Sequence, residues 1–105
     1  MAHGNHYFCM LTPVRPNMHG NLTAAEGEIF GQHCEYLKRK FNEKCVLQAG
    51  TSFEENEDGF AIVILNAEEK AAAVAIMQAD PAVAKGLLKA HVTAYNIFLD
   101  RGMAL

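Results

Sequence analysis

The sequence predicts an α+β fold in which a four-stranded antiparallel sheet carries two helices on one face. Three observations indicate it: a long amphipathic segment, an acidic Asp-Gly turn between two apolar runs, and the order strand, helix, strand, strand, helix, strand. The chain has 105 residues and is 50% hydrophobic, so we expect one domain over residues 1–105, with its core over about residues 6–99.

The amino-terminal third predicts a strand, a loop and a helix. The aromatic and apolar run 6–11 is typical of a strand that ends before the first proline. Residues 13–21 hold two prolines and a glycine, which predicts a loop long enough to form a lid or a rim. Thr23 and Glu26 have the spacing of a capping box, so the first helix should run from about residue 24 to residue 42.

The middle of the chain predicts a hairpin. Residues 45–53 form the second expected strand, and the acidic stretch 54–59 ends in Asp-Gly, a strong turn signal. Residues 60–65 form the third strand. This strand has no polar side, so we expect it to be buried on both faces.

The carboxy-terminal third completes the sheet. An alanine-rich helix should begin at residue 66 or 67 and end near residue 78. A short helical turn is expected from Asp80-Pro81 to about Gly86, followed by a last strand over residues 91–99. The whole pattern is a split βαβ sandwich, with both helices on the same side of the sheet.

Two helices can cover only one face of such a sheet. The apolar third strand would therefore leave its other face in water. Burying apolar area gains about 25 cal/mol per Å², and a patch of several hundred Å² seldom stays exposed on a monomer. We expect a second copy of the chain to cover it, sheet against sheet, in a symmetric dimer. The alternative is that the loops fold over this face.

A histidine lies where the first helix should present a core residue. Phe30, Cys34, Leu37 and Phe41 recur at helical spacing and mark an apolar stripe. His33 falls on the same stripe, one turn before Leu37, so its ring should point toward the interior. A buried imidazole needs partners for its ring nitrogens.

The best distant partner for His33 is Asp80. A neighbouring carboxylate would orient the imidazole and fix its tautomer, as general acid–base catalysis requires. Each residue also has a structural alternative. His33 can be a core histidine bonded to a backbone carbonyl, and Asp80 can be the N-cap of a helix with Pro81 at its first position.

Composition argues against several classes of protein. The net charge is −3 with scattered Lys and Arg, so we expect no nucleic-acid partner. No apolar stretch is long enough for a membrane span and no charged-then-apolar leader opens the chain, so we expect a cytoplasmic protein. The three cysteines are irregularly spaced, and the metal and phosphate motifs CxxC, HExxH and a glycine-rich loop are absent. We therefore expect neither a metal nor a cofactor.

Three segments taken together resemble the YCII-related (YciI-like) family. They are His-Cys-Glu-Tyr-Leu at 33–37, Leu-Gln-Ala-Gly at 47–50 and Asp-Pro-Ala-Val-Ala-Lys-Gly-Leu at 80–87, and the similarity extends over residues 6–99. The resemblance implies one YCII-like domain with the ferredoxin-like fold of the dimeric α+β barrel, and hence a homodimer.

The resemblance also implies an active site in the cleft between sheet and helices. Its histidine and aspartate correspond to His33 and Asp80, and Tyr36 fits the family pattern. Family members often follow Ala-Gly with proline, whereas Thr51 stands here and could add a hydroxyl to the pocket floor. A few relatives act on ring compounds as dehydrochlorinases or similar lyases.

The leading hypothesis is proton transfer by His33, steered by Asp80, on a small cyclic or aromatic molecule. Such a reaction, dehydrochlorinase-like or that of another lyase or isomerase, needs no cofactor, since one positioned base supplies about 10² to 10⁴ in rate. Four further residues are expected to contact the substrate, although packing, solvated or interface roles would also explain them: Tyr36, Arg15, Thr51 and Tyr95. The sequence leaves open whether the chain is an enzyme, and the alternative is a non-catalytic small-molecule-binding or dimerisation module.

Overall fold

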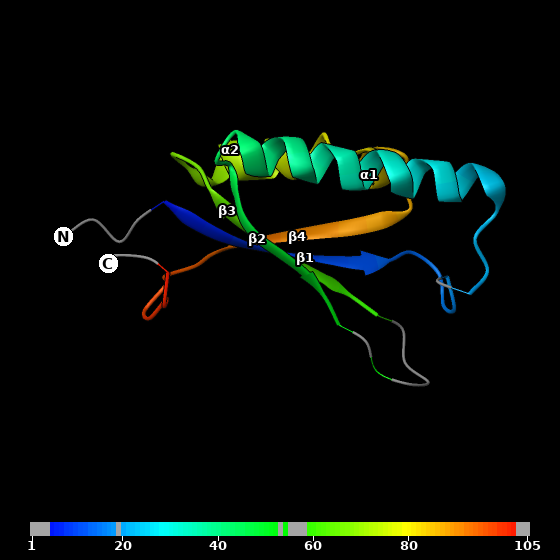
Figure 1. Ribbon diagram of the computed structural model, residues 1–105, viewed down its shortest axis with the longest axis horizontal. Helices are drawn as coiled ribbons and strands as arrows, with labels where there is room; N and C mark the ends of the chain where they lie inside the picture. Colours follow the sequence, from blue (N-terminus) through cyan, green and yellow to red (C-terminus); the bar gives the residue numbers. More distant parts are fainter. Residues whose placement is uncertain (1–4, 19, 53, 55–58, 103–105) are drawn as a thin grey trace.

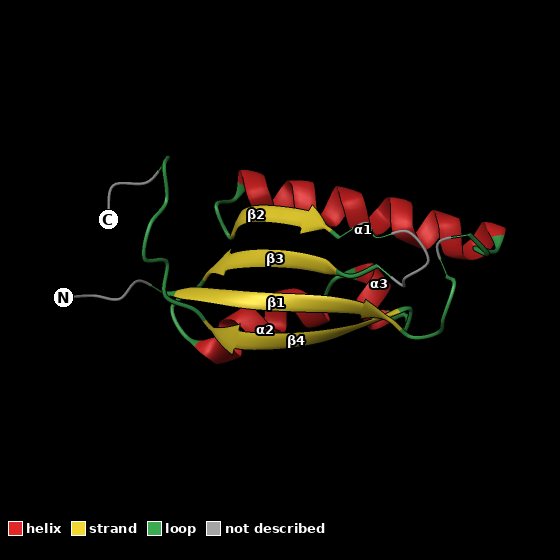
Figure 2. Cartoon of the chain, turned by 90° about the horizontal axis from the view of Figure 1, so that it is seen from below, coloured by secondary structure: helices red, strands yellow, loops and turns green. Residues whose placement is uncertain are grey.

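A computed structural model of the chain describes residues 5–18, 20–52, 54 and 59–102. Its elements follow in the order β1 (His6–Pro13), α1 (Ala24–Asn42), β2 (Val46–Thr51), β3 (Ala61–Asn66), α2 (Lys70–Gln78), α3 (Pro81–Ala84) and β4 (Leu88–Ala94). The strands form one sheet in the order β2-β3-β1-β4, and all neighbouring pairs are antiparallel. The helices lie on one face of this sheet (Figure 1) and leave the other face open (Figure 2). The predicted α+β, ferredoxin-like fold is confirmed.

Helix α1 begins and ends where the sequence predicts. The Thr23 hydroxyl accepts from the backbone N–H of Glu26 at 3.1 Å, and a Glu26 carboxylate oxygen accepts from the backbone N–H of Thr23 at 3.0 Å. This reciprocal capping box satisfies two of the free N–H groups at the helix start. At the other end, Lys44 adopts a left-handed backbone with φ of 69° and turns the chain toward β2.

Helix α2 starts later, and strand β1 ends later, than the sequence indicates. Helix α2 begins at Lys70 rather than near residue 66, because Asn66 still pairs with His6 and the Ala67 N–H donates to the Asn5 carbonyl at 2.8 Å. Those bonds keep the backbone extended. Strand β1 continues to Pro13, which faces Leu88 at the end of the ladder.

Strand β4 covers Leu88–Ala94 instead of residues 91–99. Its length is set by its partner, since Ala94 faces Tyr7 and the last bond of the ladder runs from the Tyr95 N–H to the His6 carbonyl at 3.0 Å. Beyond His6 the strand β1 offers no further residues to pair with. The alternation over residues 95–99 is therefore not a strand. The end of the expected second strand, at Phe53, and most of the expected acidic turn, residues 55–58, lie outside the described residues.

The core lies between the sheet and the helices. It is built from buried side chains on both layers: Cys9, Leu11, Val46, Val63, Leu65, Ala73, Met77, Ala82 and Leu88. In β3, Val63 and Leu65 belong to this core, while Ile62 and Ile64 alternate with them and point to the open face. The third strand is thus apolar on both sides, as the sequence predicts. Among the described residues, none of the helices combines the length and the apolar character needed to cross a bilayer.

Candidate active site

Two side chains that are 47 residues apart in the sequence meet between α1 and α3. Nδ1 of His33 lies 2.6 Å from Oδ2 of Asp80. The Asp80 side chain is fully buried, and the His33 side chain is only 12% exposed. A carboxylate only accepts, so Nδ1 carries the hydrogen of this bond. The structure therefore brings together the two residues that the sequence singles out.

The short helix α3 fixes the Asp80 carboxylate. Its second oxygen, Oδ1, accepts from the backbone N–H of Ala82 at 2.9 Å, which makes Asp80 the N-cap. Pro81 occupies the first turn, where its fixed φ suits a helix start. Gly86, with φ of 78°, then leads the chain into β4. One carboxylate thus serves as helix cap and as histidine partner, so the two roles weighed for Asp80 coexist.

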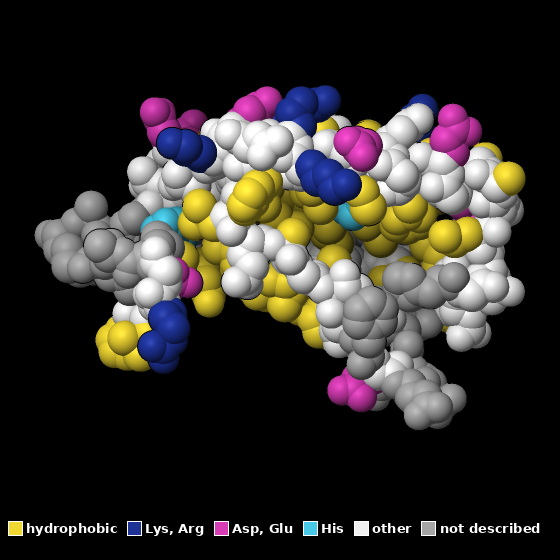
Figure 3. Space-filling model, viewed as in Figure 1, with side chains coloured by type: hydrophobic (Ala, Val, Ile, Leu, Met, Phe, Trp, Pro, Cys, Tyr) yellow, Lys and Arg dark blue, Asp and Glu magenta, His cyan; other side chains and the backbone are white. Residues whose placement is uncertain are grey.

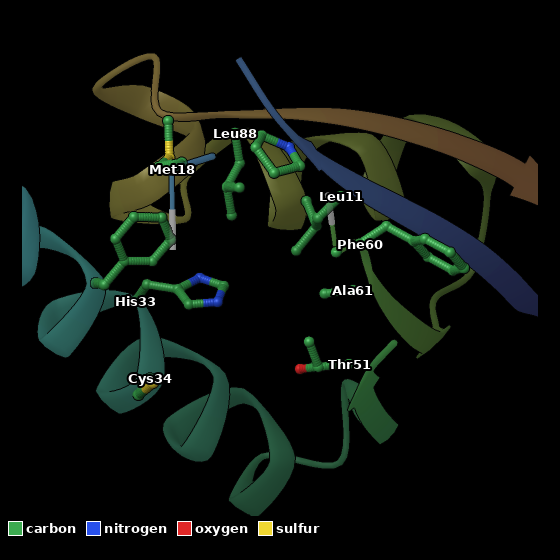
Figure 4. A pocket seen from close by; sticks show the side chains of 11 residues that line it. Leu11, Met18, His33, Cys34, Thr51, Phe60, Ala61 and Leu88 are labelled. Carbon is green, nitrogen blue, oxygen red and sulfur yellow. The ribbon is translucent and has the colours of Figure 1, made fainter. Parts of the chain in front are cut away.

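A cavity of about 200 Å³ opens beside the imidazole. Figure 4 shows the His33 ring pointing into it from α1, with Thr51 on the opposite side. Most of its walls are apolar, and the space-filling view shows hydrophobic side chains around a histidine in a hollow beneath α1 (Figure 3). The lining residues are Leu11, Pro13, Met18, Phe30, His33, Cys34, Thr51, Gly59, Phe60, Ala61 and Leu88.

The geometry assigns different roles to the two ring nitrogens of His33. Because Nδ1–H is bonded to Asp80, the lone pair of a neutral ring lies on Nε2. Nε2 is on the cavity side of the ring, so this lone pair can accept a proton from a bound molecule (Figure 4). Among the described lining residues there is no Lys, Arg, Asp or Glu. The arrangement can therefore exchange a proton with a mostly apolar ligand.

Tyr36 lies on another side of α1 and does not line this cavity. It is buried, and its hydroxyl donates to the Ile76 carbonyl at 2.5 Å, which ties α1 to α2. Burial raises the pKa of this phenol. The Arg39 and Lys40 side chains lie over the ring, at 5.3 Å and 5.6 Å from its centroid.

Arg15 and Tyr95 are also placed away from the cavity. Arg15 forms a two-bonded ion pair with the Glu26 carboxylate, at 2.5 Å and 2.8 Å. The hydrogen bonds from Arg15, and then the backbone N–H of Thr23, lower the pKa of Glu26 to about 2, and the same pairing raises the pKa of Arg15. Tyr95 lies against Phe8 with ring centroids 5.7 Å apart, beside the open face of the sheet.

Several cavity residues were not identified from the sequence. Leu11 and Leu88 are ordinary strand residues, and only the register that pairs β1 with β4 brings their side chains to the site. Met18 is an isolated apolar residue in the proline-containing loop. An apolar side chain among polar loop residues was the one sequence feature that could have indicated its burial. Among the residues that the structure describes, no group of three or more His, Cys, Asp or Glu side chains could hold a metal ion.

The three cysteines, all within the described residues, are free thiols. Cys9 is fully buried in the core, and burial raises its pKa to about 11. Cys34 is exposed on α1 at the edge of the cavity.

Comparison with known proteins identifies the fold. No protein-family model matches the chain, and no curated protein matches it in sequence. Among solved structures, the chain is similar to the 5-chloro-2-hydroxyhydroquinone dehydrochlorinase TftG from Burkholderia phenoliruptrix AC1100, in complex with 2,5-dihydroxybenzoquinone. The TM-score is 0.62 at 15% identity, covering 86% of this chain and 93% of that one.

A second similar structure is SnoaB, a cofactor-independent oxygenase from Streptomyces nogalater. Its TM-score is 0.52 at 11% identity, covering 93% of this chain and 97% of that one. At these identities the similarity concerns the backbone alone. The chain therefore has an α+β, ferredoxin-like fold similar to that of these two structures.

Proposed function

We propose that the chain is a YciI-like protein that transfers a proton on a small cyclic or aromatic molecule bound in the cavity beside His33. The observation that carries the proposal is the 2.6 Å contact of His33 with a fully buried carboxylate, at the wall of a cavity of about 200 Å³. An ion pair on the surface has no enclosed cavity beside it. A histidine with a purely structural role has no reason to direct its second ring nitrogen into a cavity.

The proposed chemistry uses Nε2 as the base and Asp80 as the orienting group. In an elimination, Nε2 takes a proton from the substrate, the electrons of the broken bond form a double bond, and a leaving group departs from the adjacent carbon with its bonding pair. In an isomerisation, His33 returns the proton to another atom of the same molecule. The Asp80 carboxylate stabilises the imidazolium that forms, and such general-base catalysis contributes about 10² to 10⁴ in rate.

The walls of the cavity favour a ring-shaped substrate. Phe30 and Phe60 supply aromatic surface, and Thr51 supplies a hydroxyl that can donate to a substrate oxygen. The ligand named in the TftG structure, 2,5-dihydroxybenzoquinone, is a compact oxygenated ring. We therefore propose hydroxylated or chlorinated monocyclic aromatics as the substrate class.

The test is turnover of a panel of chlorinated hydroquinones, hydroxyquinones and phenols, with chloride release and solvent-deuterium incorporation as readouts. His33→Ala and Asp80→Asn should each lower any turnover at least 100-fold. Glu35→Gln is the matched control, because it neutralises an exposed carboxylate on α1 that does not line the cavity. Turnover that survives both site substitutions contradicts the mechanism. Binding at His33 without turnover would instead indicate a binding module.

We also propose that the open face of the sheet is covered by a second copy of the chain. Phe8, Ile62 and Ile64 point to this face from its two central strands, and Leu47 and Tyr95 border the same groove. No described helix covers it (Figure 2). A stable interface buries about 800 Å² on each partner, and an apolar sheet face can supply an area of that order.

The assembly is tested by sedimentation. The wild-type chain should sediment at twice its monomer mass of 11.5 kDa. Ile62→Asp places a charge at the centre of the face and should shift the protein to monomer, whereas Gln32→Asp, on exposed α1, should not. A monomeric wild-type protein would contradict the proposal.

We place this homodimer in the cytoplasm, in keeping with its free thiols.

A further inference from the structure

Among the described residues of the loop between β1 and α1, one side chain is buried. Met18 is 2% exposed, although Pro16, Asn17 and Gly20 around it are exposed. Its side chain does not join the main core cluster but lines the cavity into which His33 points (Figure 4). A thioether that is buried from a surface loop acts as a wall of that cavity, because the loop backbone itself stays in solvent.

The backbone around Met18 is a closed turn. The Asn21 N–H donates to the Met18 carbonyl at 3.1 Å, and the Asn21 side-chain amide donates to the Asn17 carbonyl at 2.8 Å. Asn17 has a positive φ of 56°, a conformation that asparagine tolerates better than most residues. These bonds fix the direction in which Met18 leaves the loop.

One ion pair ties this turn to helix α1. Arg15 bonds both oxygens of the Glu26 carboxylate and also donates to the Asn21 carbonyl at 2.8 Å. The Glu26 carboxylate is held in turn by the capping box with Thr23. A two-bonded guanidinium–carboxylate pair defines orientation as well as distance.

A second bond ties the loop to the other side of the site. The Val14 N–H donates to the Leu87 carbonyl at 3.1 Å, at the junction between α3 and β4. The loop is thus anchored both to the helix that carries His33 and to the segment that follows Asp80. These two anchors hold the loop from which the buried Met18 side chain projects.

We propose that Met18 determines the length of ligand that the His33 cavity accepts, and that the Arg15–Glu26 ion pair is the positioning contact that holds Met18 there. The proposal refines the proposed function, since it concerns the same cavity. It depends on the shape of the cavity and not on proton transfer. Each further methylene buried in an apolar site strengthens binding about fourfold, so the wall should show as a sharp limit on chain length.

The test is binding of n-alkylbenzenes, from toluene to n-butylbenzene, to the full chain by calorimetry. The wild-type affinity should stop rising at a short alkyl group. Met18→Ala should move that limit by about two methylenes and strengthen n-butylbenzene binding about 16-fold. Leu22→Ala is the matched control, because Leu22 is an exposed apolar residue of the same loop and does not line the cavity.

The positioning contact is tested with the same series. Arg15→Ala and Glu26→Gln should weaken the discrimination between toluene and n-butylbenzene, while Arg15→Lys should restore part of it. If the ion pair only stabilised the fold, its removal would lower the melting temperature without changing the ratio of the toluene and n-butylbenzene affinities. Thermal melting of each variant confirms that it is folded at the assay temperature.

Unchanged chain-length profiles in Met18→Ala overturn the proposal, and so does the absence of alkylbenzene binding in both wild type and variant. Unchanged discrimination in Arg15→Ala and Glu26→Gln overturns the positioning role. Because alkylbenzenes carry no group for His33 to deprotonate, these outcomes are independent of turnover. A failure of the proposed chemistry appears only in the substrate panel.

Discussion

Asp80→Asn separates the two roles of the buried carboxylate. The amide has nearly the same shape, and its oxygen can still accept from the Ala82 N–H at the start of α3. The other position becomes an NH₂ group facing Nδ1 of His33, which is 2.6 Å from Oδ2 in the native protein. An NH₂ group can only donate, so the histidine must present a lone pair at Nδ1 and carry its hydrogen on Nε2.

The magnitude of this change follows from the bonds exchanged. A charge-assisted hydrogen bond, worth about 1.5–3 kcal/mol, is replaced by a neutral one worth about 0.5–1.5 kcal/mol. The free energy of unfolding should therefore fall by about 1–2 kcal/mol. Asp80→Ala should lose about 1 kcal/mol more, because the cap on α3 is lost as well. Proton abstraction should fall by 10² or more in both variants, since Nε2 no longer has its lone pair or its orientation.

Two assays measure these effects. Urea unfolding gives the stability of wild type, Asp80→Asn and Asp80→Ala, and ¹⁵N spectra of the imidazole identify the tautomer of His33 directly. In the wild type the neutral ring should carry its hydrogen on Nδ1, and in Asp80→Asn on Nε2. An Asn variant with native stability and the native tautomer would refute the inferred hydrogen bond, and with it the reason for assigning Nε2 to the cavity.

Other predictions concern residues around the site. Tyr36→Phe should lower the unfolding free energy by about 1 kcal/mol, because the bond to the Ile76 carbonyl is lost, and calorimetry should find cavity binding unchanged; weakened binding would give Tyr36 a ligand role. The pKa of Glu26 is lowered to about 2 from 4.5, so its contribution is complete above about pH 4.5 and is lost as the pH falls toward 2. Urea unfolding should accordingly find the stability gap between wild type and Arg15→Ala closing over that range, and a constant gap would contradict the pairing. At pH 8 a thiol reagent should label exposed Cys34 rapidly and Cys9, whose pKa is raised to about 11, only after unfolding; rapid labelling of the double variant Cys34→Ser/Cys45→Ser, at the rate of unfolded protein, would argue against a buried Cys9.

Features governed by local chemistry could be predicted from the sequence. The capping box of Thr23 and Glu26 determines the start of α1, and His33 lies on its inner side as predicted. The apolar stripe was only partly right, because two of its members, Cys34 and Phe41, are exposed. The meeting of His33 with Asp80 was inferred from the need of a buried imidazole for a partner. The resemblance to the YciI-like family pointed to the same pair.

Features that depend on distant partners could not be predicted. The end of β4 is set by where β1 begins, so alternation alone misplaced it by several residues. Arg15 was expected to contact the substrate at the rim of the site, but it forms an ion pair with Glu26 instead. This pairing depends on the path of the loop, which the sequence does not reveal. The burial of Met18 depends on that same path, which no periodicity describes.

Proton transfer by His33 requires that its Nε2 contacts the bound molecule. A titration of ¹⁵N-histidine-labelled protein with hydroxylated aromatics, 2,5-dihydroxybenzoquinone among them, tests it most directly. On binding, the Nε2 resonance of His33 should move while its Nδ1 resonance keeps the signature of a strong hydrogen bond. Ligands that bind the protein and leave Nε2 of His33 unperturbed would contradict it.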